Sequence, residues 1–136
     1  MTTPQSILYV EALFAIPGIV LGMSHLVQPQ MWQRFFKGLA ARGTDGVLIR
    51  SFLFELWPAI GIVVFHQDWS LPGVFLTLYG HALLLKVIMS LLVPRIGVKS
   101  LEQAERTGTW AFVPAGIILT ALGLICAIRT APSFFS

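Results

Sequence analysis

Residues 71–94 read LPGVFLTLYGHALLLKVIMSLLVP, an apolar stretch that is long enough to cross a lipid bilayer. His81 and Lys86 lie inside it. An ionisable side chain in hydrocarbon is costly, so each such residue needs a polar partner and is a candidate for a functional role. The stretch therefore predicts a membrane-spanning helix and directs attention to its polar residues.

The composition of the whole chain is typical of a membrane protein. Of its 136 residues, 56% are hydrophobic and 11% are charged. A soluble domain has about 25% charged residues, so part of this apolar surface needs lipid to cover it. The formal charge of +3 comes without a long basic run, and we expect no nucleic-acid partner.

Three further segments resemble the first in length and hydropathy. Together they predict four spans, at about residues 6–26, 46–65, 71–93 and 110–128. Each is close to the roughly 20 residues that a helix needs to cross about 30 Å of hydrocarbon. Backbone groups in lipid must be hydrogen-bonded within their own segment, which favours helices. We expect a single all-α domain over residues 1–136, a bundle of four transmembrane helices.

The positive charges predict an orientation. They gather in the loops after the first and third spans, as Arg34, Lys37, Arg42, Arg95, Lys99 and Arg106, whereas the loop HQDWS at residues 66–70 has none. By the positive-inside rule, the first and third loops are cytoplasmic and both termini lie on the outer, periplasmic side.

The first loop contains a pattern of its own. On a helix over residues 29–42, the polar residues Gln33, Arg34 and Lys37 fall away from one apolar face formed by Met31, Trp32, Phe35, Phe36 and Leu39. This pattern predicts a short amphipathic helix lying in the cytoplasmic interface of the membrane. A helix docked on the bundle is the alternative.

Two ionisable residues lie at a similar depth in neighbouring spans. At a rise of 1.5 Å per residue, Glu55 is roughly 13 Å and Lys86 roughly 10–12 Å from the cytoplasmic end of its span. An ion pair would spare each an isolated charge in lipid. We expect a Glu55–Lys86 pair that fixes how these helices dock, with a proton-linked or ion-linked site as the alternative.

The other ionisable residues stand at separate depths. His81 lies near mid-membrane, and we expect a neutral ring bonded to a carbonyl or hydroxyl; a proton relay or metal ligand is the alternative. Glu11, about one and a half turns inside the first span, is expected to reach outward or take up a proton. His25, at the inner surface, and His66 with Trp69, at the outer surface, are read as interfacial. No two histidines match in depth, and no metal-ligand spacing or catalytic motif occurs, so we expect no haem, metal or other cofactor.

Small residues predict where helices pack. Gly18 and Gly22 form a GxxxG motif in the first span, and Gly116 and Gly123 lie on one seam of the fourth. Apolar helices associate in lipid through such close-packing positions. The expected partners are the lipid bilayer and other membrane helices, from copies of this chain or from a larger complex.

The strings GMSHLVQPQMW at residues 22–32 and TLYGHALLLKVIMSLLVP at residues 77–94 resemble segments of small uncharacterised bacterial four-helix integral membrane proteins. The resemblance implies a four-helix fold and a bacterial inner membrane. In similar sequences we expect tryptophan in place of His81. It implies no activity.

These observations leave three functions open. The first is a non-enzymatic accessory or structural subunit of a membrane assembly, favoured by short loops, small-residue seams and the lack of a catalytic motif. The second is a small oligomeric proton-linked transporter or channel that uses Glu55, Lys86 and His81. The third is a membrane enzyme or redox protein that acts on lipid or quinone.

Overall fold

The computed structural model describes residues 4–135, and 89% of it is helical, with no strand in that range. The elements in chain order are α1 (Gln5–Val27), α2 (Pro29–Ala41), α3 (Thr44–Leu48), the π-helix η1 (Ile49–Glu55), α4 (Leu56–Phe65), α5 (Val74–Leu92), α6 (Pro94–Arg106), the 3₁₀-helix η2 (Gly108–Ala111) and α7 (Phe112–Phe135).

Four helical stretches are long and apolar enough to cross a membrane, namely Gln5–Val27, Thr44–Phe65, Val74–Leu92 and Gly108–Phe135. The all-α class and the presence of four helices long and apolar enough to span a membrane are thereby confirmed, and their insertion into a membrane stays a prediction. The largest difference is at the end of the fourth span, which continues beyond residue 128 to Phe135. Arg129 therefore lies within a helix and not, as the pattern of apolar residues suggested, at the start of a polar tail.

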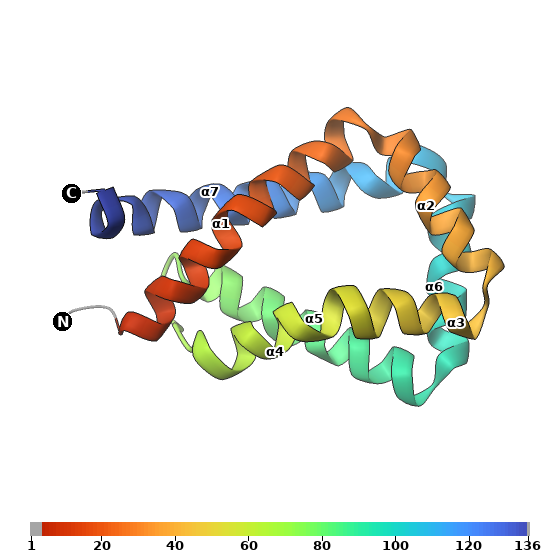
Figure 1. Cartoon of the computed structure of the whole chain (residues 1–136), viewed down its shortest axis with the longest axis horizontal. Helices are drawn as coiled ribbons and strands as arrows, with labels where there is room; N and C mark the ends of the chain where they lie inside the picture. Colours follow the sequence, from red (N-terminus) through yellow and green to blue (C-terminus); the bar gives the residue numbers. More distant parts are fainter. Residues whose placement is uncertain (1–3, 136) are drawn as a thin grey trace.

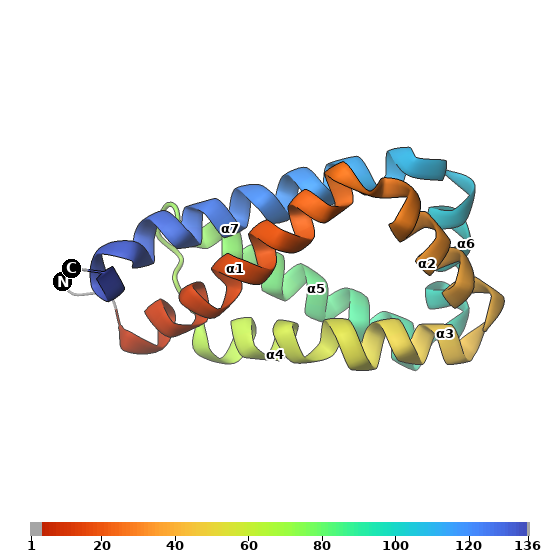
Figure 2. The ribbon, with the colours of Figure 1, turned by 45° about the horizontal axis from the view of Figure 1, so that its top comes forward.

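The long helices form two pairs. α1 runs along α7, and the continuous stretch from α3 through η1 to α4 runs along α5 (Figure 1). The short helices α2, α3 and α6 join the two pairs at one end, and both chain ends lie at the other, as the turned view also shows (Figure 2). Few contacts link α1 to α4. The two pairs are thus held together mainly at their ends.

The α1–α7 pair depends on glycines. A Cβ added to Gly22 would lie 2.5 Å from the backbone nitrogen of Thr120, and one added to Gly123 would lie 2.6 Å from that of Ile19. Gly18 and Gly116 are similarly close to the facing backbone, at 3.1 Å from Gly123 and 2.8 Å from Gly22. All four glycines that the sequence singled out lie at this crossing, where the backbones approach too closely for a side chain.

α2 packs on the protein with part of its apolar face. Leu39 is buried in a small core with Val47 and Leu101, which come from α3 and α6. Further along the same face, Met31 and Phe35 remain about two-fifths exposed. The packing of Leu39 is that of a helix docked on the bundle, and a place for α2 in the membrane interface stays a prediction.

Candidate functional site

A cavity of about 990 Å³ separates the two helix pairs. Its walls are almost entirely apolar and come from α1, α2, η1, α4 and α5, with Leu119 from α7. Four lining side chains, Leu13, Phe54, Trp57 and Phe65, are more than half exposed. Since Leu13 belongs to α1 and the others to η1 and α4, the cavity opens on the surface that lies between these helices.

The cavity is closed at the end near the chain termini. There Ala15, Ile62, Leu76 and Cys126, one from each long helix, form a buried core. Its apolar character and its volume, at the upper end of the roughly 300–1,000 Å³ of small-molecule sites, match a site for an apolar ligand or chain.

Three charged residues meet in the wall of this cavity, and we call them the Glu55 cluster. Nζ of Lys86 lies 3.1 Å from both carboxylate oxygens of Glu55, and Nε of Arg50 lies 3.2 Å from Oε1. The structure therefore brings together Glu55 and Lys86, as their equal depths suggested, and adds Arg50 as a third member.

The π-helix explains why Arg50 reaches Glu55. In an α-helix, residues five positions apart point about 140° away from each other. The i→i+5 hydrogen bonds of a π-helix instead place such residues nearly above one another, and η1 spans Ile49–Glu55. Pro58, three residues after the end of η1, has no amide proton to give the carbonyl of Phe54, which disfavours a regular α-helix here.

Arg50 is the most deeply buried member of the Glu55 cluster. Its side chain is 4% exposed, against 15% for Glu55 and 46% for Lys86. Nη1 donates a hydrogen bond of 3.3 Å to the hydroxyl of Ser100 in α6. Nη2 is buried and has no hydrogen-bond partner within residues 4–135. The guanidinium group thus keeps unused donor capacity in the cavity wall.

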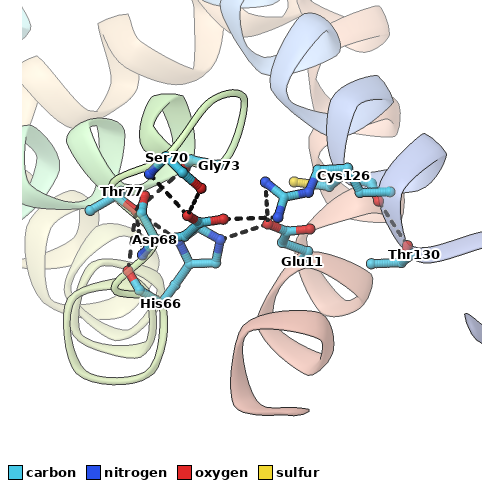
Figure 3. A network of polar contacts seen from close by, with 9 residues as sticks. Glu11, His66, Asp68, Ser70, Gly73, Thr77, Cys126 and Thr130 are labelled. Atoms are coloured by element: carbon cyan, nitrogen blue, oxygen red, sulfur yellow. Dashed lines mark hydrogen bonds and ion pairs between the residues drawn. The ribbon is translucent and has the colours of Figure 1, made fainter. Parts of the chain in front are cut away.

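A second polar assembly lies at the opposite end, between the helix pairs. We call it the Glu11 network, and its members are Glu11, His66, Asp68, Thr77 and Arg129. Oε1 of Glu11 lies 2.8 Å from Nε2 of His66 and 3.3 Å from Nη1 of Arg129, and Nη2 of Arg129 donates to Asp68 at 2.8 Å. Figure 3 shows Glu11, which comes from α1, turned toward His66 and Asp68, which both come from the segment between α4 and α5.

Thr77 ties His66 to the loop after α4. Its hydroxyl donates to the carbonyl oxygen of Asp68 at 2.8 Å and lies 3.0 Å from Nδ1 of His66. The other ring nitrogen, Nε2, lies 2.8 Å from Oε1 of Glu11. The ring is therefore held in place from both of its nitrogens.

Asp68 lies in the loop between α4 and α5, outside the spans. Partial burial raises its pKa, but hydrogen bonds from Ser70 and Arg129 outweigh burial and hold the pKa below the ordinary value of 3.8. The carboxylate is therefore ionised at neutral and mildly acid pH, where it keeps its ion pair with Arg129.

Two sequence-based interpretations of the Glu11 network were wrong. His66 is fully buried and is not an interfacial residue in contact with water, because its ring bridges Glu11 and Thr77. Glu11 does not reach outward either, since it is 1% exposed and turns inward to His66 and Arg129.

The remaining candidates have ordinary local partners. Nδ1 of His81 lies 2.8 Å from the carbonyl oxygen of Thr77, one turn earlier, and the ring contacts Trp69. The ring of His25 stacks on Trp32 at 4.2 Å, and Trp32 donates to the hydroxyl of Ser24. Among residues 4–135, no group of three or more His, Cys, Asp or Glu side chains is arranged to hold a metal ion.

The sequence reasoning missed Arg50, Asp68 and Arg129 as members of polar sites. Arg50 lies just inside the second predicted span. A signal was present, since an arginine within an apolar segment needs a partner as much as a glutamate does. Arg129 and Asp68 gave no such signal, because each lies at the end of an apolar run.

Comparison of this chain with protein-family models, with curated proteins and with solved structures gave no match.

Proposed function

We propose that this protein binds an amphiphile of the surrounding bilayer in the cavity between its two helix pairs. The observation that carries the proposal is a large, almost wholly apolar cavity that opens between α1 and α4. In a membrane this opening would face lipid, so hydrocarbon chains would have direct access to it. The proposal shares the class of ligand with the third function that the sequence left open, a membrane enzyme or redox protein that acts on lipid or quinone, but it includes no reaction.

We also infer the orientation of the protein in a bacterial inner membrane. The end that carries α2 and α6 holds Arg34, Lys37, Arg42, Arg95, Lys99 and Arg106, and the positive-inside rule assigns it to the cytoplasm. The Glu11 network and both chain ends would then lie toward the periplasm. The Glu55 cluster would lie in the cytoplasmic half of the bilayer.

The other two functions stay predictions. An accessory subunit needs a partner on its exposed helix faces, and proton-linked transport needs a pathway on both sides of the Glu55 cluster. Oligomerisation is likewise a prediction. Ligand binding in the cavity is compatible with an assembly of several copies, since the proposal concerns the cavity within each one.

A substitution of Gly61 tests the proposal directly. Gly61 lines the cavity, and a Cβ placed on it meets no other atom within 4 Å. Gly61→Phe should therefore fill the cavity without a clash. The new side chain would take the place of an apolar part of the ligand of similar size. Burying such a part is worth about 1.5–3 kcal/mol, so a ligand that can no longer bury it should bind at least about tenfold more weakly.

The measurement is native mass spectrometry of the purified full chain, with the bound small molecules extracted and identified. Gly38→Phe is the matched control, because Gly38 also has open space around it but lies on α2 outside the cavity lining. We expect co-purified amphiphile in the original protein and in Gly38→Phe, and its loss in Gly61→Phe. Equal amounts in all three proteins would contradict the proposal.

A further inference from the structure

The cavity wall carries an unbalanced positive charge. Arg50 and Lys86 contribute two positive charges, and Glu55 contributes one negative charge. The lining residues include no other carboxylate. A single charge left in an apolar environment is costly, and a bound group of opposite sign is one way to offset that cost.

The hydrogen bonds of the cluster lead to the same conclusion. Nη2 of Arg50 is buried without a partner within residues 4–135, and a buried donor without an acceptor costs about 1–3 kcal/mol. Lys86 has three donors and a half-exposed side chain that lines the cavity. Oε2 of Glu55 is also buried without a hydrogen bond in that range, so what the cluster lacks is negative charge. An oxygen acid beside Lys86 would accept from its free donors and supply that charge.

We propose that the ligand is an amphiphile with an acidic head, a carboxylate or phosphate, which binds Lys86 next to the charge of Arg50 while its hydrocarbon chain occupies the apolar cavity. This inference rests on the proposed function and names the chemical class of the ligand. Phe14, Trp57 and Phe65 line the path of the chain. A neutral head, as in a quinone or a fatty alcohol, would leave the extra positive charge unbalanced.

A spin-labelled fatty acid tests the charge requirement. The probe is 16-doxyl-stearic acid, which quenches tryptophan fluorescence on contact, and its methyl ester is the matched neutral probe. Of the four tryptophans, Trp32 and Trp57 line the cavity. The full chain therefore carries Trp69→Phe and Trp110→Phe, so that only the two tryptophans of the cavity fluoresce. Only the part of the quenching that saturates with probe concentration is taken as binding.

We expect the acid to bind at least about tenfold more tightly than its ester, since a hydrogen bond to a charged group is worth about 1.5–3 kcal/mol. Lys86→Met should remove most of this preference, and Lys86→Arg, which keeps the charge, should retain it. Helical content measured by circular dichroism shows whether both variants are folded. Lys86→Arg separates the effect of the positive charge from that of the lysine side chain itself.

The outcomes separate the two proposals. Equal affinity of acid and ester, or a preference that survives Lys86→Met unchanged, overturns the acidic head but keeps the cavity as an amphiphile site. The absence of saturable quenching by either probe overturns both. Full displacement of the acid by potassium acetate would show a site for small free anions and also overturn the inference, because the hydrocarbon chain would then add nothing.

Discussion

At the scale of single residues, the structure separates two uses of buried charge. In the Glu11 network each charged group contacts one of opposite sign, although Oε2 of Glu11 and Nη1 of Arg129 are buried without a hydrogen bond to any of residues 4–135. The Glu55 cluster instead has two positive side chains on one carboxylate, in the wall of the cavity. The first arrangement is that of a structural contact between helices, and the second is that of the proposed binding site.

Glu11→Ala should weaken the protein strongly. It would leave the fully buried His66 without its carboxylate partner and Arg129 with Asp68 alone, and removing one partner of a buried pair typically costs about 3–5 kcal/mol. The free energy of unfolding in mixed micelles measures this loss.

The matched control is Glu102→Ala, which removes the exposed Glu102–Arg106 pair of α6. An exposed pair of this kind is worth at most about 0.5 kcal/mol. If Glu11→Ala costs no more than Glu102→Ala, the Glu11 network does not hold the two helix pairs together.

At the scale of helices, the close crossing of α1 and α7 predicts a sharp response to one added methyl group. Gly22→Ala would place Cβ 2.5 Å from a backbone nitrogen of α7, which cannot move away as a side chain would. Overpacking of this kind costs about 1–3 kcal/mol, and the same unfolding measurement applies.

For Gly38→Ala we expect the free energy of unfolding to change in the opposite direction. A Cβ on Gly38 meets nothing within 4 Å, so the change should stabilise α2 by up to about 1 kcal/mol through its helix propensity. Two Gly→Ala changes of opposite sign would support the packing of α1 on α7. A neutral result at Gly22 would show that the two helices are farther apart than described.

The positions of the long helices could largely be predicted from the sequence. Hydropathy located the four spans, and the rise of a helix placed Glu55 beside Lys86. The π-helix at Ile49–Glu55 could not be predicted, because hydropathy does not distinguish a π-helix from an α-helix, and Arg50 was therefore left out of the site. His66 and Arg129 could not be placed either, since their contacts join residues far apart in the chain.

At the scale of the whole molecule, the inferred orientation predicts which loops reagents can reach. A single cysteine at Gln67, in the loop between α4 and α5, should react with a membrane-impermeant maleimide added to intact cells. A cysteine at Lys37 in α2 should react only after the membrane is opened. Both side chains are exposed, and Cys126 is buried, so background labelling is small. The reverse pattern of labelling would invert the orientation.

The pairing of α1 with α7 also bears on how the protein is assembled during synthesis. The α4–α5 hairpin is local in sequence and can form as soon as α5 leaves the ribosome. α1 must remain in the bilayer without its partner until α7 has been translated, with its glycine groove open to lipid or to other proteins. A nascent chain interrupted before α7 would therefore contain nearly all the residues that line the cavity, but its α1 wall would lack the helix on which it packs.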